Sequence, residues 1–252
     1  MIDPIPRVAV FDAYGTLFDV HSAVARHRAL VGPDAAALSE LWRTKQLEYA
    51  WVTSLIGRYE PFWTLTERAL DHALARFPTV PAEAREPLLE AYRQLDAYPE
   101  AASTLDALRA RGLALAVLSN GDPAMLAAAV AASGLGAAFD AVLSVEAAGV
   151  FKTAPAAYAL VGERFGAAPA EVLFASSNRW DVAGAAAFGF RAVWVNRAGL
   201  PDEYPDLAPA ATIRALDALT TDGSRIAGGL APVAAAGGDR GPGPTARTAP
   251  PP

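Results

Sequence analysis

The sequence predicts an α/β protein in which a doubly wound parallel sheet carries a helical cap, inserted after the first strand. Residues 8–11 form a continuous apolar run, which is typical of a strand buried on both faces of a parallel sheet. From about residue 99 onward, helical and strand patterns alternate, which favours parallel strands joined by crossover helices. Between residues 20 and 97 there is little strand pattern, which indicates a helical insertion.

The insertion is expected to begin with a helix near Ser22. A long helix is predicted over residues 34–56, because apolar side chains recur at helical spacing and form a stripe that we expect to be buried. The stripe consists of Leu38, Leu41, Trp42, Tyr49, Val52, Leu55 and Ile56. Gly57 ends this helix, and two more helices are predicted over residues 62–77 and 82–95, with prolines between them.

In the rest of the chain, predicted strands and helices alternate. Strands are predicted over residues 113–118, 141–145, 172–175 and 192–195. Helices are predicted over residues 99–111, 122–133, 155–165 and 180–188, and a final short helix over 212–219. Residues 1–19 and 98–221 would therefore form a Rossmann-like core, and residues 20–97 the cap. Residues 222–252 are rich in glycine, proline and alanine, which cannot bury enough apolar surface to offset the entropy of ordering, so we expect a disordered tail.

Composition narrows the classes of partner. The chain has 252 residues and a net charge of -6, which argues against nucleic acid or an anionic membrane as partner. It contains no cysteine, which excludes disulfides, thiolate metal sites and a cysteine nucleophile. No apolar run is long enough to span a membrane, and the first residues lack the pattern of a signal peptide. We expect a soluble cytoplasmic protein.

The first candidate for chemistry is Asp12, which directly follows the predicted strand at residues 8–11. Open α/β sheets bind their ligands at the carboxyl ends of strands. Gly15 then permits a sharp turn, and Thr16 offers a hydroxyl. A carboxylate on a rigid strand end can serve as a nucleophile, although an aspartate here could equally cap a helix or a turn.

Three later segments favour the nucleophile. They are Leu118-Ser-Asn-Gly121, Phe151-Lys152 and Ser176-Ser-Asn-Arg-Trp-Asp181, and each adjoins a predicted strand end or helix start. Taken singly, each has a simpler interpretation as a turn, a surface lysine or a helix cap. Together with the stretch around Asp12, over residues 7–217, they resemble the haloacid dehalogenase superfamily. More narrowly, Asp12-Ala-Tyr-Gly-Thr16, Trp42-Arg-Thr-Lys-Gln-Leu-Glu-Tyr49 and Ser176-Ser-Asn178 are similar to the L-2-haloacid dehalogenases.

Two departures from the phosphatases of that superfamily support the narrower resemblance. Those enzymes carry a second aspartate two residues after the nucleophile, where this chain has Tyr14. They also bind Mg²⁺ through an acidic pair, where this chain has Ser176 and Ser177. Magnesium normally needs more than one carboxylate, whereas a halide leaves as a stable anion without acid or metal. We therefore expect no metal and no cofactor.

The resemblance implies an enzymatic activity and a role in it for individual residues. Asp12 would displace the halide of an L-2-haloalkanoate and form an aspartyl ester, which water would hydrolyse to a D-2-hydroxyalkanoate. The residues implied in catalysis are Asp12, Thr16, Arg43, Asn120, Lys152, Tyr158, Ser176, Asn178 and Asp181. The residues implied in substrate binding are Ala13, Tyr14, Arg43, Leu47, Phe62, Ser119, Asn120 and Trp180. Periodicity alone would leave Arg43 solvated, whereas the resemblance implies that it faces the active site.

Two other functions remain as alternatives. One is a small-molecule phosphatase of the same superfamily, against which Tyr14 and Ser177 argue. The other is a non-catalytic binding protein, which the set of polar motif residues disfavours because buried polar groups without a task are costly. The three histidines lie outside the motifs and receive no catalytic role. Since the related dehalogenases are often homodimers, we also expect a homodimer.

Overall fold

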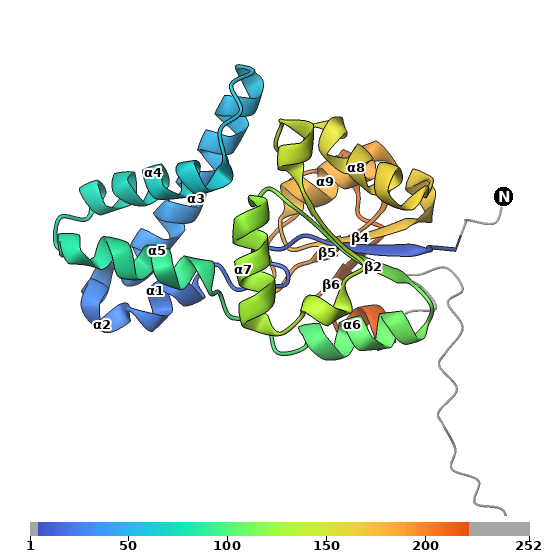
Figure 1. The fold of residues 1–252 in the computed structure, drawn as a ribbon, viewed down its shortest axis with the longest axis horizontal. Coiled ribbons are helices and arrows are strands. Elements are labelled where there is room, and N and C mark those ends of the chain that lie inside the picture. Colours follow the sequence, from blue (N-terminus) through green and yellow to red (C-terminus); the bar gives the residue numbers. More distant parts are fainter. Residues whose placement is uncertain (1–4, 222–252) are drawn as a thin grey trace, which may run out of the picture.

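The structure is a computed structural model, and it describes residues 5–221. Within these residues, six strands form one parallel sheet (Figure 1). The strands are β1 Val8–Phe11, β2 Ala114–Ser119, β3 Ala141–Ser144, β4 Val172–Ser176, β5 Arg191–Val195 and β6 Ala211–Ile213. Their order is β3-β2-β1-β4-β5-β6, so the chain starts in the middle of the sheet and extends it in both directions. The order reverses beside β1, which is where open α/β sheets bind ligands.

The central position of β1 follows from its sequence. All four of its residues are buried, and Val10 lies between Ala116 of β2 and Phe174 of β4. Only a strand that is apolar on both faces can be placed there without burying unpaired polar groups. Helices cover the two faces of the sheet, so the predicted α/β, doubly wound fold class is confirmed.

The helices of the sheet layer follow the expected alternation. On one face lie α6 (Ala101–Ala110) and α10 (Ala218–Thr221), and on the other lie α8 (Pro155–Phe165) and α9 (Arg179–Phe188) (Figure 1). The remaining helix, α7 (Pro123–Ser133), packs beside β3 and α5. Apart from α10, each of these helices occurs within a few residues of the range that the sequence predicts.

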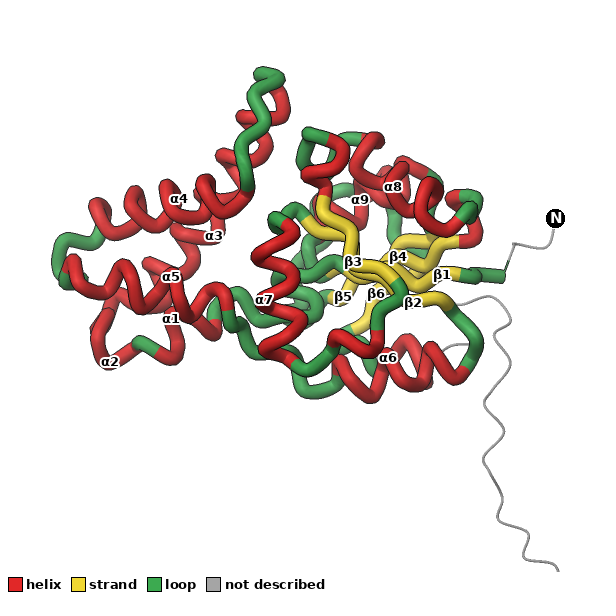
Figure 2. The backbone as a smooth tube through the Cα atoms, in the orientation of Figure 1, coloured by secondary structure: helices red, strands yellow, loops and turns green. Residues whose placement is uncertain are grey.

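Between β1 and β2 the chain forms helices alone, and we call residues 20–97 the helical segment. Its helices are α1 Ser22–Arg26, α2 Arg28–Val31, α3 Ala35–Leu55, α4 Phe62–Arg76 and α5 Arg85–Arg93. They lie together to one side of the sheet (Figure 2). The outgoing and returning chains meet where Asp19 N donates to Asp96 O at 2.8 Å and Tyr98 N donates to Leu17 O at 2.9 Å. The division into a core and a cap remains a prediction.

The predicted stripe on α3 is correct only in its first part. Leu38 and Trp42 are buried, but Val52, Leu55 and Ile56 are exposed, so the expectation that these three are buried is wrong. Figure 1 shows the reason, since the last turns of α3 extend past α4 and α5, so that no other helix of the helical segment covers them. Periodicity identifies the apolar face of a helix but not whether another element covers it.

The final predicted helix, over residues 212–219, is also wrong in part. Residues 211–213 form β6, which pairs in parallel with β5, and a short helix begins only at Ala218. A strand of three residues is too short to show an alternating pattern, and its pairing with β5 decides its structure.

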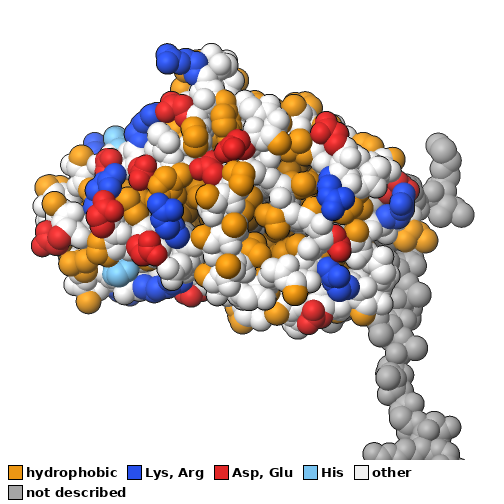
Figure 3. All heavy atoms as spheres, in the orientation of Figure 1, with side chains coloured by type: hydrophobic (Ala, Val, Ile, Leu, Met, Phe, Trp, Pro, Cys, Tyr) orange, Lys and Arg blue, Asp and Glu red, His pale blue; other side chains and the backbone are white. Residues whose placement is uncertain are grey.

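The surface and the chain ends add three observations. Within residues 5–221, every helix is too short or too polar to cross a membrane. On the face that Figure 3 shows, basic and acidic side chains are interspersed and do not form a single basic patch. The predicted disordered tail, residues 222–252, lies outside the described residues.

Candidate active site

Polar side chains meet at the carboxyl ends of three adjacent strands. Asp12 follows β1, Ser119 ends β2 and is followed by Asn120, and Ser176 ends β4. Because these strands are parallel neighbours, their carboxyl ends lie at one edge of the sheet. All four side chains are buried, so the site lies beneath the surface of the protein.

The carboxylate of Asp12 is surrounded by hydrogen-bond donors. Lys152 Nζ lies 3.1 Å from its Oδ1. Its Oδ2 accepts hydrogen bonds from Asn178 Nδ2 at 2.8 Å, Thr16 Oγ1 at 3.1 Å and Ser176 Oγ at 3.4 Å. Asp12 is 5% exposed, so these donors take the place of water in stabilising its negative charge, and they also fix its direction.

Lys152 is shared between two carboxylates. Its Nζ donates to Asp181 Oδ2 at 2.8 Å as well as contacting Asp12, and its side chain is fully buried. Burial alone would lower the pKa of Lys152, but the charges of Asp12 and Asp181 outweigh it, and the pKa is raised. Lys152 therefore remains a cation inside the protein, and one ammonium offsets two carboxylates.

Asp181 differs from Asp12 in its surroundings. Burial raises its pKa to about 6, against the opposing effects of the Lys152 charge and the hydrogen bonds from Lys152 and Tyr158. Tyr158 Oη donates to Asp181 Oδ1 at 2.8 Å, and burial together with the Asp181 charge raises the pKa of this phenol. Near neutral pH, Asp181 is a carboxylate that is ready to accept a proton, as a general base must be.

The loop after β2 is tied to the loop that carries Lys152. Asn120 Oδ1 accepts the backbone N–H of Lys152 at 3.0 Å, and Ser119 Oγ accepts the N–H of Gly121 at 3.1 Å. Both side chains therefore shape the site in addition to the binding roles that the resemblance implies.

Thr16 is held by residues that the sequence analysis did not include in the site. The N–H of Ser177 donates to Thr16 Oγ1 at 2.8 Å, and Arg197 Nη2 donates to Thr16 O at 3.0 Å. Arg197 in turn pairs with Glu100 at 2.6 Å. No motif marks Arg197, because its task depends on contacts with residues far away in the sequence.

An aromatic cluster lies beside the loop that follows Asp12. Tyr14 stacks on Tyr92 with ring centroids 5.8 Å apart, and its ring lies 6.4 Å from that of Phe62. Burial raises the pKa of both Tyr14 and Tyr92, so both remain neutral phenols. Tyr92 was also missed, since in the sequence it resembles any apolar residue on the buried face of a helix.

The second face of α3 approaches the same loop. Arg43 Nη2 donates to Tyr14 O at 3.4 Å, and Leu47 lies half-buried one turn further along. Ala13 is buried, and its carbonyl accepts the N–H groups of Leu17 and Phe18 in the turn that follows Asp12. The guanidinium of Arg43 is thus close to the loop after Asp12, as the resemblance implies.

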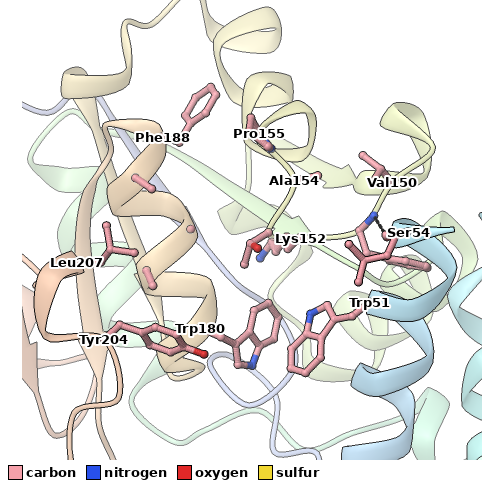
Figure 4. A pocket seen from close by; sticks show the side chains of 16 residues that line it. Trp51, Ser54, Val150, Lys152, Ala154, Pro155, Trp180, Phe188, Tyr204 and Leu207 are labelled. Atoms are coloured by element: carbon pink, nitrogen blue, oxygen red, sulfur yellow. Dashed lines mark hydrogen bonds between the residues drawn. The ribbon is translucent and has the colours of Figure 1, made fainter. Parts of the chain in front are cut away.

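Trp180 lines a pocket that Lys152 also lines. Its ring meets that of Trp51 edge-on, with centroids 5.4 Å apart, so α9 and α3 touch here. A pocket of about 830 Å³ opens at this contact, and Lys152 is among its lining residues (Figure 4). On the same helix as Trp51, Ser54 Oγ accepts the N–H of Phe151 at 3.0 Å. Trp180 and Lys152 thus line the same pocket.

Within the described part of the chain, no three His, Asp or Glu side chains are grouped so that they could hold a metal ion. Asp12 and Asp181 are instead linked by the ammonium of Lys152.

Comparisons with known proteins identify the family of the chain. The model of the haloacid dehalogenase-like hydrolase family matches residues 6–189. The chain is 48% identical over 204 residues to (S)-2-haloacid dehalogenase 1 of Pseudomonas sp. (strain CBS-3), covering 81% of this chain and 89% of the relative. It is 47% identical over 210 residues to (S)-2-haloacid dehalogenase 4A of Burkholderia cepacia, covering 83% and 90%.

A solved structure has a similar fold over most of the chain. The L-2-haloacid dehalogenase from Xanthobacter autotrophicus, with chloropropionic acid covalently bound, matches with a TM-score of 0.76 and 39% identity. The match covers 85% of this chain and 97% of that one.

Proposed function

The chain belongs to the haloacid dehalogenase-like hydrolase family, and we infer from its relatives and its site that it is an (S)-2-haloacid dehalogenase. It hydrolyses L-2-haloalkanoic acids to D-2-hydroxyalkanoic acids through an aspartyl ester. The observation that carries this function is the buried carboxylate of Asp12, which meets Lys152 at 3.1 Å and three uncharged donors within 3.4 Å. Such a carboxylate is anionic, poorly hydrated and fixed in direction, which suits a nucleophile.

In the first step, an oxygen of Asp12 attacks C2 of the substrate from the side opposite the halogen. The new C–O bond forms as the C–halogen bond breaks, the halide leaves with the bonding electrons, and the configuration at C2 inverts. Arg43 and Asn120 would stabilise the departing halide, while Ser119 and the backbone N–H groups from Ala13 onward would hold the substrate carboxylate. Developing negative charge needs such contacts most where water is excluded.

In the second step, water attacks the carbonyl carbon of the aspartyl ester. Asp181 takes a proton from this water, and the bond between the carbonyl carbon and the substrate's oxygen breaks. That oxygen takes the proton from Asp181, the hydroxy acid leaves, and Asp12 is regenerated as a carboxylate when its remaining proton passes to solvent. Support for Asp181 as the base comes from its raised pKa of about 6, which keeps it a carboxylate yet able to take up a proton near neutral pH. Lys152 and Tyr158 fix its direction.

The apolar residues of the proposed site shape the space that holds the C2 side chain of the substrate. Tyr14, Leu47, Phe62 and Trp180 would surround the C2 side chain of the substrate. The helical segment, residues 20–97, would act as a cap that excludes water from the site. We further propose that the enzyme works as a homodimer in the cytoplasm, and the exposed apolar end of α3 supports the first of these two.

Halide release tests the function. The enzyme should release chloride from L-2-chloropropionate but not from the D-enantiomer, and EDTA should leave the rate unchanged because no step uses a metal. A phosphate ester with Mg²⁺ serves as the parallel assay. Phosphate release that depends on Mg²⁺, without halide release, would instead establish the phosphatase alternative.

A further inference from the structure

Asp122 lies directly after the Ser119–Gly121 loop, at the start of α7, and its carboxylate is turned toward another helix. Its Oδ1 accepts the N–H of Phe62 at 2.7 Å, and its Oδ2 accepts the N–H of Trp63 at 2.8 Å. These are the first N–H groups of α4, about 60 residues earlier in the chain. A residue of the sheet layer thus caps a helix of the helical segment.

The start of α4 needs such a cap. The first N–H groups of a helix lack partners within it and lie at the positive end of its dipole. Pro61 precedes α4, and a proline side chain cannot accept a hydrogen bond. Asp122 is 7% exposed, so its two bonds are shielded from water and strengthened by its charge.

The cap fixes the place of Phe62. The ring of Phe62 lies 6.4 Å from that of Tyr14 and 5.8 Å from that of Phe151, the residue before Lys152. Since the bond from Phe62 to Asp122 starts at the backbone N–H, any shift of the first turn of α4 moves this ring relative to Tyr14. The loop after β2 therefore sets two parts of the site, because Asn120 holds the backbone of Lys152 and Asp122 holds that of Phe62.

We propose that Asp122 is a positioning residue that selects substrates by size: it caps α4, holds Phe62 against Tyr14, and so sets the width of the pocket for the C2 side chain. The proposal rests on the function proposed above and adds to it a residue that acts through Phe62. It requires that the loss of Asp122 affect substrates with a C2 side chain more than a substrate without one.

The test compares Asp122→Ala with the wild type on chloroacetate, which has no C2 side chain, and on L-2-chlorobutyrate, which carries an ethyl group. We expect kcat/KM for L-2-chlorobutyrate to fall about 5- to 30-fold more than kcat/KM for chloroacetate, the factor that results if the stabilisation given by a helix cap is lost only for the larger substrate. In a Phe62→Leu background, the same substitution should have little further effect. Asp122→Asn, which keeps one acceptor oxygen, should give a smaller change and serves if the alanine variant fails to fold.

Amide hydrogen exchange gives a readout that does not depend on activity. Exchange at residues 62–66 should be faster in Asp122→Ala, while exchange in α5 stays unchanged. Asp140→Ala is the matched control, because Asp140 Oδ2 also accepts a backbone N–H, from Leu115 at 2.8 Å, but far from α4. It should show no dependence on substrate size.

Equal losses for both substrates, or unchanged exchange at residues 62–66, would overturn the proposal. If the wild type released halide from neither substrate, the proposed function would fail, and the exchange comparison would still decide whether Asp122 holds α4.

Discussion

At the scale of single residues, the site separates two carboxylates by their surroundings. Asp12 is held by four donors, including Lys152, whereas Asp181 is completely buried and shares Lys152 with it. In the proposed mechanism one carboxylate attacks and the other accepts a proton, and two carboxyl groups can take different roles in this way only in different environments.

This division predicts the dependence of activity on pH. Since burial raises the pKa of Asp181 from 3.8 to about 6, and Asp181 acts in the hydrolysis of the ester, kcat should fall as the pH drops through about 6 and Asp181 takes up a proton. Tyr158→Phe removes a hydrogen bond that favours the ionised form, so the acid limb should move to higher pH. Rate profiles of both proteins from about pH 4.5 to 8 make the comparison; a limb that does not move would mean that another group titrates.

The same shift affects stability with a definite sign. Because folding raises the pKa of Asp181, the folded protein binds this proton more tightly than the unfolded chain does. The contribution of Asp181 to stability is therefore complete below pH 3.8 and is lost as the pH rises through about 6.

Among single residues, the sequence predicted those site residues that belong to recognisable motifs. Asp12, Lys152, Ser176 and Asn178 follow strand ends or open helices, and the structure brings them together as expected. Asp122 was predicted only as a helix start. Its partners lie in a helix that no local pattern connects to it, so the sequence alone could not identify its task.

At the scale of elements, the loop between β2 and α7 has no room for a larger residue at Gly121. An added Cβ at Gly121 would lie 2.7 Å from Tyr14 Cε2 and 3.1 Å from its hydroxyl. Because Tyr14 is buried and stacked on Tyr92, it cannot easily move away. The glycine is thus required by a close approach between two parts of the site.

We therefore predict that Gly121→Ala lowers the free energy of unfolding by about 1–3 kcal/mol, the usual effect of overpacking, and raises KM. Gly136→Ala is the control, because its Cβ would meet Val130 at an ordinary 3.5 Å. Chemical denaturation and steady-state kinetics measure both effects. If the two variants were equally stable, the contact between Gly121 and Tyr14 would not constrain the site.

The elements themselves were largely predictable, and the two errors have a common origin. The helices and strands of the sheet layer carry strong periodic or apolar patterns, and so their ranges were close. Strand β6 and the exposed end of α3 depend instead on which neighbour is present. The periodicity of a segment does not show which strand it will pair with, or whether another helix will cover it.

At the scale of the whole molecule, the exposed end of α3 needs an explanation. Val52, Leu55 and Ile56 are adjacent there, and Leu55 is 86% exposed. We predict that Leu55→Glu weakens or abolishes the proposed homodimer, because a charge would be buried without a partner. Light scattering after size exclusion gives the mass, and Leu200→Glu, at a residue 61% exposed, is the control. A wild-type monomer, or a Leu55→Glu dimer of unchanged stability, would contradict this interface.

The account as a whole depends on Asp12 forming a covalent bond with the substrate, and isotope transfer measures this directly. The enzyme, in excess over L-2-chloropropionate, is allowed one turnover in water enriched in ¹⁸O. Water that attacks the aspartyl ester leaves its oxygen on Asp12, so mass spectrometry should find the label in the peptide that contains Asp12, with unlabelled D-lactate as product. Label that appears directly in the lactate after one turnover would contradict the account, because water would then have displaced the halide itself.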